Sequence, residues 1–233
     1  MNNVVLSAKY PIFAEKLTKL GYNVISSEQL PQLIPYEQDH ADIQCLILDN
    51  TAFIQRECTT LAERLKPLCN VVLTADDIGA EYPKNVRLNA AVVGKNVIAR
   101  LDSLDNRVKS YCQSHGYRLI NVRQGYAGCS CAVVFDHALI TADNGVFNSL
   151  KEYKIDVLRI EQGRVALKGA DYGFIGGASG LDIRSGKRIL YFTGDIKHHP
   201  NGSDIEEFCK LHDTEIWCLT DAELTDIGGM IFC

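Results

Sequence analysis

The chain ends in the segment Asp226-Ile-Gly-Gly-Met-Ile-Phe-Cys233, an apolar, strand-like run that stops on a cysteine. A cysteine thiolate is a strong nucleophile, so Cys233 is a candidate for covalent catalysis. The α-carboxylate of the same residue lies next to the thiol and raises its pKa by charge repulsion unless it is paired. The alternative is that Cys233 only completes the last strand of the fold.

His40-Ala41-Asp42 is the only His-x-Asp sequence in the chain. A histidine can transfer protons to a reacting group, and a carboxylate can hold a cation. The motif leads into the apolar run CLIL, so we expect the side chains of His40 and Asp42 to point towards the centre of the fold. In the alternative interpretation, the segment EQDHAD is a polar cluster on the surface that starts a turn or a helix.

Two further acids, Asp143 and Asp195, each follow an apolar run directly, in the segments ITAD and FTGD. Asp195 is followed by His198 and His199, and loops at strand ends often carry functional residues. The two carboxylates could form a pair at one rim of the fold. They could equally cap the helices that follow, a role in which aspartate is favoured.

Cys129 and Cys131 are separated by one residue in the segment GCSCAVVF. If this segment is a strand, both sulfur atoms face the same side. They could form a redox pair or a soft-metal site, and Cys129 is a second candidate nucleophile. No Cys-x-x-Cys motif accompanies them, so we predict no metal and no cofactor. The plain alternative is that both are small core residues.

The sequence repeats one pattern four times: strand, tight polar turn, strand, helix and strand. Short polar turns between two apolar runs are typical of β-hairpins. A single unit is too small to bury its own apolar face, so the units must pack on one another. The four units begin at Ala41, Arg87, Gly128 and Gly177.

The two ends of the chain together supply a fifth unit. The N-terminal segment contains the runs NVVL, YPIFAEKLTKL and YNVIS, and it lacks only the first strand, which the C-terminal GGMIFC provides. We therefore predict an α/β fold with five ββαβ units, in one domain over residues 1–233. The units form a β/α propeller whose ring is closed by pairing of the N- and C-terminal strands, with the helices outside. The alternative, a doubly wound parallel sheet, conflicts with the hairpin turns.

Composition narrows the classes of function. The chain has 46% hydrophobic and 23% charged residues and a net charge of −5 with both signs scattered, which argues against nucleic acid or an anionic membrane as a partner. It shows neither the ~20-residue apolar run of a membrane span nor the features of a secretory signal. The nine cysteines lie mostly in apolar segments, which indicates a reduced, cytoplasmic protein.

With this pattern, the sequence resembles the guanidine-modifying, or pentein, superfamily. The segments GYAGCSCAVV…ALITADNG, GFIGGASG…ILYFTGDIKHHP and LTDIGGMIFC carry the resemblance. They resemble more closely a bacterial family of unknown function with the same fold. The resemblance implies a pentein-like five-unit β/α propeller. Its members include arginine and agmatine deiminases, dimethylarginine hydrolases and amidinotransferases, and also a non-enzymatic ribosome anti-association factor.

The resemblance also implies roles for single residues. In catalytic members a cysteine that follows a glycine pair attacks the guanidinium carbon, and Gly228-Gly229-Met230-Ile231-Phe232-Cys233 has this spacing. A His-x-Asp motif supplies the acid/base and a carboxylate for the guanidinium. The corresponding unit reads Gly180-Leu181-Asp182 here, so Asp182 matches and a glycine replaces the histidine.

Two functions follow as expectations. The first is a central pocket for a small guanidino or amidino compound, with thiol-dependent hydrolase or deiminase chemistry. It would use Cys233 or Cys129, His40 and Asp42, with Asp182, Asp143, Asp195 and His198 as further binding residues. The second is a non-catalytic, ring-shaped binding module with a protein or ribonucleoprotein partner.

Overall fold

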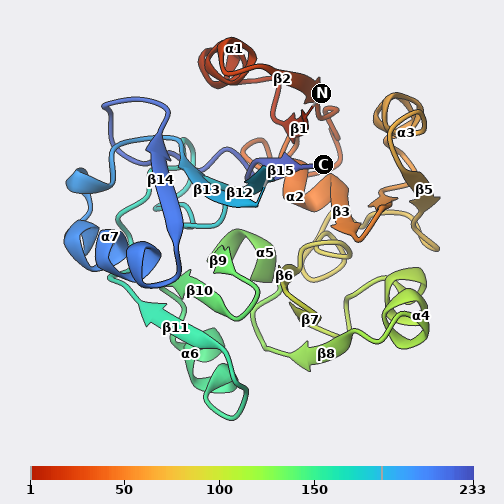
Figure 1. The fold of residues 1–233 in the computed structure, drawn as a ribbon. Helices are drawn as coiled ribbons and strands as arrows, with labels where there is room; N and C mark the ends of the chain where they lie inside the picture. Colours follow the sequence, from red (N-terminus) through yellow and green to blue (C-terminus); the bar gives the residue numbers. More distant parts are fainter. Residues whose placement is uncertain (1, 185) are drawn as a thin grey trace.

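The structure, a computed structural model, describes residues 2–184 and 186–233. It contains five sheets of three strands each, and all five have one topology (Figure 1). In each sheet the inner strand pairs antiparallel with the middle strand, which pairs parallel with the outer strand. The predicted α/β class and five repeated units are confirmed, and the antiparallel pairs exclude a doubly wound parallel sheet.

The strands group by position. The inner strands are β3 (Cys45–Leu48), β6 (Ala91–Val93), β9 (Cys131–Phe135), β12 (Ser179–Arg184) and β15 (Ile231–Phe232). The middle strands are β1 (Asn2–Leu6), β4 (Thr51–Ile54), β7 (Asn96–Ala99), β10 (Ala138–Thr141) and β13 (Lys187–Phe192). The outer strands are β2 (Tyr22–Ser26), β5 (Asn70–Leu73), β8 (Arg118–Asn121), β11 (Asp156–Arg159) and β14 (Thr214–Cys218).

One helix in each unit joins the middle strand to the outer strand, because a parallel pair needs a crossover connection. Figure 1 shows these helices at the periphery and the inner strands around a shared central region. The inner strands contact one another in the order β6–β9–β12–β15–β3. The helices are α1 (Pro11–Lys19), α3 (Thr59–Leu65), α4 (Asn106–Ser114), α6 (Asn144–Leu150) and α7 (Gly202–Leu211).

The chain termini share one sheet. β15 pairs with β1, with Val4 opposite Phe232 and Val5 opposite Ile231. Asn3 N–H donates to the Cys233 carbonyl at 3.0 Å, and Cys233 N–H donates back to the Asn3 carbonyl at 3.0 Å. The pairing of the two terminal strands that the repeat predicted is therefore present.

The buried apolar side chains form five clusters, each between two neighbouring sheets. Ile140 of β10 and Leu190 of β13 share one cluster, for example. Leu17 of α1 and Tyr191 of β13 share another, which joins the terminal sheet to its neighbour. Each such side chain contributes roughly 1.5–3 kcal/mol on burial, so the units stabilise one another laterally. No helix in the described part of the chain is long and apolar enough to cross a membrane.

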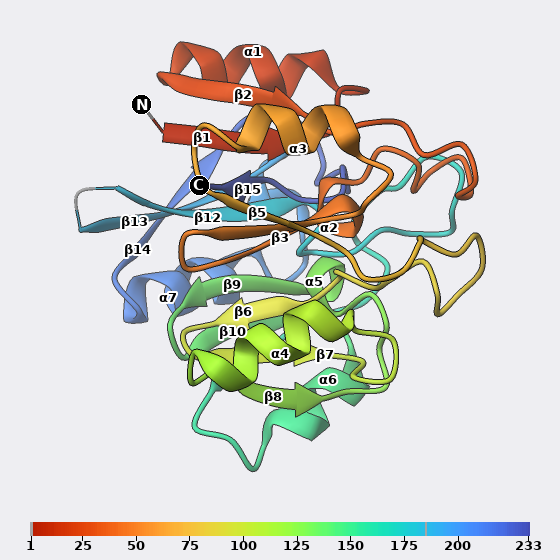
Figure 2. The ribbon, with the colours of Figure 1, turned by 90° about the vertical axis from the view of Figure 1, so that its right-hand side faces the viewer.

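In two of the units the first strand begins later than the sequence suggested. The segments starting at Ala41 and Gly128 each open with one helical turn, α2 (Ala41–Gln44) and α5 (Ala127–Ser130), before β3 and β9. Contacts from other units hold these turns: the backbone N–H of Asp42 donates to the Gly228 carbonyl at 2.9 Å, and that of Cys129 to Asn89 Oδ1 at 3.1 Å. Figure 2 shows α2 and α5 at the same end of the inner strands. These partners are remote in sequence, so the local apolar pattern did not reveal them.

Asp226 ties the segment before β15 to the rest of the fold. The residue is 1% exposed, and its carboxylate accepts hydrogen bonds from Phe174 N–H at 2.8 Å and Gly228 N–H at 2.9 Å. A Cβ atom at Gly177 would lie 2.0 Å from this carboxylate, so the glycine allows the close approach. The N–H groups of Phe174 and Gly228 both have the Asp226 carboxylate as their acceptor.

We predict that Asp226→Asn lowers the free energy of unfolding by about 3 kcal/mol, because the amide cannot accept from both buried donors. Urea denaturation at neutral pH measures the change. The matched control is Glu223→Gln, an exposed acid in the same segment that makes no side-chain hydrogen bond in the described structure and should stay within about 0.5 kcal/mol. A loss below about 1 kcal/mol for Asp226→Asn would contradict the structural role.

Candidate functional site

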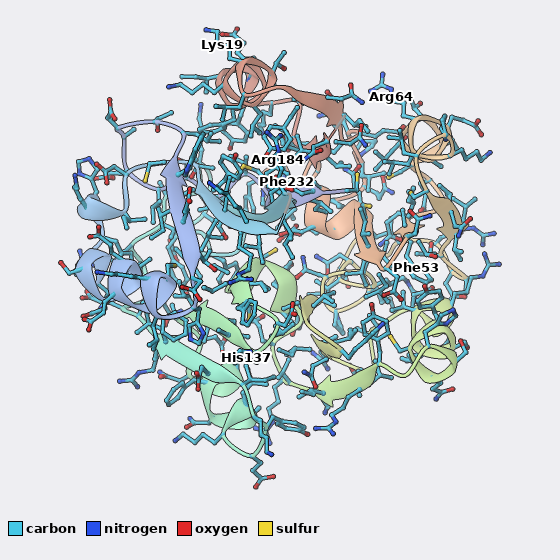
Figure 3. All side chains as sticks on the ribbon, viewed as in Figure 1. Lys19, Phe53, Arg64, His137, Arg184 and Phe232 are labelled. Atoms are coloured by element: carbon cyan, nitrogen blue, oxygen red, sulfur yellow. The ribbon has the colours of Figure 1, made fainter. Side chains whose placement is uncertain are left out.

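A cavity of about 300 Å³ lies between the inner strands. Its charged lining residues are Asp42 and Asp49, and within the described chain none of the lining side chains is basic. Figure 3 shows Phe232, one of the lining residues, near the centre of the molecule. All five inner strands contribute apolar lining, including Leu46, Ile47, Val92, Val133, Leu181, Ile231 and Phe232.

Asp42 connects the cavity to a buried polar cluster. The Cys129 thiol donates to Asp42 Oδ2 at 2.8 Å, and Asn89 Nδ2 donates to Cys129 Sγ at 3.0 Å. Three atoms that could bind a metal ion lie within 4.8 Å of one another, one each from His40, Asp42 and Cys129. The structure therefore brings together the His-x-Asp motif and the second candidate cysteine, from α2 and α5.

The glycine pair near the C-terminus positions this cluster. Gly228 has φ +76°, and a Cβ atom on it would lie 2.4 Å from His40 Cα. Gly229 has φ +75° and lies beside Asp42, where a Cβ atom would be 3.8 Å from Oδ2. Positive φ angles favour glycine, so the pair allows the terminal segment to pack against His40 and Asp42.

The carboxyl group of Asp42 has its pKa raised to about 6, chiefly by burial. The nearby carboxylates of Asp226 and Glu37 raise this pKa further, while His40 and the thiol of Cys129 lower it. Although Asp42 borders the cavity, its Oδ1 atom is buried and has no hydrogen-bond partner in the described structure, and neither has His40 Nε2. Buried polar atoms without partners are uncommon in folded proteins.

The Cys129 thiol is neutral in this arrangement. Burial raises its pKa well above the usual value, and the negative charge of Asp42 raises it further. The protonated form agrees with the geometry, in which the thiol donates to a carboxylate oxygen. A positive charge next to Asp42 would offset that repulsion and favour the thiolate.

The cluster is surrounded by further polar residues, which the sequence did not single out. Asn85 Nδ2 donates to Glu37 Oε2 at 2.9 Å and to the Tyr126 hydroxyl at 2.8 Å. Burial raises the pKa of Glu37, and the bonds from Tyr126 and Asn85 partly offset this. Glu37 begins the segment EQDHAD, but nothing in the local sequence indicates its partners.

Cys233 lies elsewhere. It is not among the described residues that line the cavity, and Figure 2 shows the C-terminus at the end of the inner strands opposite α2. The pKa of its thiol is raised to about 11 by burial and by Cys69. The structure does not bring Cys233 together with His40 and Asp42.

The other predicted binding residues have local partners outside the cavity. Asp143 caps α6 by accepting from Val146 N–H at 2.8 Å, and Asp195 caps the short 3-10 helix η1 (Ile196–His198) by accepting from Lys197 N–H at 2.9 Å. The capping alternative therefore describes both acids. His198 Nε2 lies 2.9 Å from the Asp221 carbonyl.

Asp182 of β12 also points away from the cavity. It accepts from the Tyr22 hydroxyl at 2.5 Å, and Arg184 Nε lies 3.8 Å from its carboxylate. Burial and the hydrogen bond to Asp182 raise the pKa of Tyr22 above its usual value. This geometry explains why Asp182 is buried without contacting the cavity.

The expectation that Cys129 and Cys131 lie on one strand is wrong. Cys129 belongs to the helical turn α5, while Cys131 is the first residue of β9 and lines the cavity. The turn is what directs Cys129 to Asp42. A single-sequence strand pattern cannot reveal this change of direction.

Comparisons with known proteins agree with the fold. The profile of a family described as "Family of unknown function (DUF6873)" matches residues 5–231. A dimethylarginine dimethylaminohydrolase adduct with S-methyl-L-thiocitrulline superposes with a TM-score of 0.56 at 11% identity, covering 93% of this chain and 91% of that one. An agmatine deiminase from C. jejuni gives 0.52 at 10% identity, covering 94% and 86%. No curated protein sequence matches significantly. The resemblance to the pentein fold is confirmed.

We predict that Asp42→Asn stabilises the protein progressively as pH rises. In the wild type the carboxyl has its pKa at about 6 when folded, above the value of about 4 in the unfolded chain. Between these values the folded state holds a proton that the unfolded state has released, so wild-type stability falls as pH rises through this window.

The difference in unfolding free energy, variant minus wild type, should therefore grow by about 2 kcal/mol between pH 4 and pH 7. Urea denaturation of both proteins across this range measures it. Asp49→Asn, at the same cavity but exposed and paired with Lys95, is the matched control and should show no such gain. A pH-independent difference for Asp42→Asn would contradict the raised pKa.

Proposed function

We propose that this chain, which belongs to the DUF6873 family of unknown function and has the pentein fold, binds a small guanidino or amidino cation in its central cavity and hydrolyses a C–N bond of it through a cysteine. The observation that carries the proposal is that Asp42 lines a cavity of about 300 Å³ while its buried Oδ1 atom has no hydrogen-bond partner in the described structure. A guanidinium group supplies the donors that this atom lacks.

The charges around the cavity favour a cation. The neighbours that most affect the pKa of Asp42 are His40, Asp226, Cys129 and Glu37, so acidic groups outnumber the single histidine. A planar cation bound to Asp42 gains attraction from two further buried carboxylates. The same charges disfavour an anionic ligand.

The residues that line the cavity determine which chemical groups the rest of the ligand can carry. The lining is largely apolar, and no described lining side chain is basic, so a carboxylate on the ligand would find no charged partner. Burying an unpaired charge is costly. A guanidino compound without a carboxylate, such as agmatine, whose chain ends in an ammonium group, therefore fits better than arginine.

The chemistry follows from the cluster. A cation at Asp42 lowers the pKa of the Cys129 thiol by charge attraction. The thiol transfers its proton to His40, the thiolate attacks the guanidinium carbon, and protonated His40 gives the proton to the ammonia or amine that leaves. Water hydrolyses the covalent thiouronium intermediate and restores the thiol, so that guanidinium and water give a ureido product and an ammonium ion.

Structural relatives support this class of reaction only as a fold-level analogy. The names of the two proteins compared above indicate reactions on guanidino compounds. We further propose that the five units form a closed ring, which keeps the inner strands and hence the cavity in a fixed geometry. Cys129, which is not itself a lining residue but contacts the lining residue Asp42, is the nucleophile in this proposal, and Cys233 is not.

Calorimetric titration with agmatine tests the binding step. We expect saturable binding that Asp42→Asn weakens at least about 10-fold, because charge-assisted hydrogen bonds are worth roughly 1.5–3 kcal/mol. Asp49→Asn, at the same cavity, should change the affinity less than about 3-fold, and arginine should bind at least about 10-fold more weakly than agmatine. Equal effects of the two substitutions would refute the role of Asp42.

Release of ammonia from agmatine tests the chemical step. Cys129→Ser should abolish release while leaving binding intact, and Cys233→Ser should leave release within about 2-fold of the wild type. The reverse pattern would assign the nucleophile to Cys233. Binding without any release in the wild type would reduce the proposal to a ligand-binding pocket.

A further inference from the structure

A second cluster of possible metal ligands lies away from the central cavity, at the boundary between two units. His137 lies in the turn between β9 and β10, and Asp156 is the first residue of β11. His212 follows α7 as its C-cap residue. Figure 3 shows His137 well away from Phe232, which lines the central cavity. The three side chains therefore come from two neighbouring units.

The ligand atoms of the three side chains are close enough to share one ion. One ring nitrogen of each histidine and one carboxylate oxygen lie within 4.8 Å of one another. His212 Nε2 lies 3.6 Å from Asp156 Oδ2, beyond hydrogen-bond distance. Ligands about 2.0–2.2 Å from a tetrahedral zinc ion are separated by distances of this order.

His212 supplies an independent indication of a ligand. Its side chain is 6% exposed, and its Nε2 atom is buried without a hydrogen-bond partner in the described structure. The atom is directed towards the Asp156 carboxylate, and the two histidine rings are 5.4 Å apart at 77°. This nitrogen is buried without a hydrogen-bond partner and lies next to a second imidazole and a carboxylate. Such an arrangement is expected of a metal ligand in the absence of its ion.

We propose that His137, Asp156 and His212 bind a divalent transition-metal ion, with Zn²⁺ as the reference ion. Two imidazoles and one carboxylate provide three protein ligands, which is the usual number at an open zinc site. The fourth position is left for water. The ion would join the β9–β10 turn and β11 to α7 of the next unit. It would act as a clip between neighbouring units, distinct from the cysteine cluster at the cavity.

The ligands are held in place by their surroundings. The backbone N–H of Asp156 donates to the His137 carbonyl at 2.7 Å, which fixes these two residues relative to each other. The Phe208 ring packs edge-on against His212 at 4.7 Å and limits its rotation. Burial lowers the pKa of His212 below its usual value.

The positive charge of Arg188 lies near the proposed metal site and limits its affinity for a cation. Arg188 donates to the His212 carbonyl at 3.3 Å and lies over the Phe135 ring at 4.1 Å, and it lowers the pKa of His212. These two contacts hold the guanidinium, although its Nε atom has no hydrogen-bond partner in the described structure. The exposed carboxylate of Asp156 opposes its charge at the site.

Titration of the metal-free protein with Co²⁺ and then Zn²⁺ tests the proposal. We expect one Co²⁺ ion with a visible ligand-field spectrum and no thiolate-to-cobalt charge-transfer band, displaced by one equivalent of Zn²⁺. His137→Ala and Asp156→Ala should each weaken Zn²⁺ binding at least about 10-fold. Both residues are exposed, so these variants should fold.

His115→Ala is the matched control, because His115 is an exposed histidine that stacks on Tyr111 in another unit. It should leave the affinity unchanged. A thiolate band would place the ion at the cysteine cluster and overturn the proposal. Absence of stoichiometric binding at micromolar Zn²⁺, or binding that is unaffected by His137→Ala and Asp156→Ala, would also overturn it.

Discussion

The buried carboxylate of Asp226 is the interaction on which the site depends. It accepts from Phe174 and Gly228 and thereby fixes the path of the chain before β15. From there Ile227 and Gly229 donate to the Gly177 carbonyl, each at 2.9 Å, and the Gly228 carbonyl accepts from Asp42. One acid thus links the terminal segment to the glycine-rich segment before β12 and to α2. The position of Asp42 follows from this chain of contacts, because α2 is only four residues long and a helix of that length is not stable alone.

The repeat made most of the fold predictable. Apolar runs separated by polar turns specify hairpins, and helical runs that follow them specify crossovers to a parallel strand. The same logic identified GGMIFC as the missing inner strand of the N-terminal unit, and β15 does pair with β1. It failed at Ala41 and Gly128, where one helical turn precedes the strand. Tertiary contacts decide those turns, since Asp42 bonds to Gly228 and Cys129 to Asn89, and neither partner is near in sequence.

The candidate site was predictable in its residue types but not in its assembly. His40, Asp42 and Cys129 stood out because of their chemistry and spacing, whereas Glu37, Asn85 and Asn89 are polar residues without any motif. Cys233 stood out because it follows a glycine pair at a suggestive spacing. In the structure the glycine pair instead packs against His40, where side chains would collide or strain the backbone. A local motif therefore marked the right segment, while the side chain that faces Asp42 comes from a different unit.

The energetics of the cluster argue for a ligand rather than for a structural role. An acid with a pKa of about 6 is destabilising when ionised at neutral pH, because the buried charge finds too few partners. Cys129 satisfies Oδ2 and leaves Oδ1 unpaired, although an asparagine or a leucine would fill the same space at lower cost. Asp226, by contrast, has a donor for each of its oxygens. Asp226 and Asp42 thus differ: the donors that Asp226 needs are supplied by the fold itself, whereas one oxygen of Asp42 is left without a donor in the described structure, and the proposed binding of a cation rests on that difference.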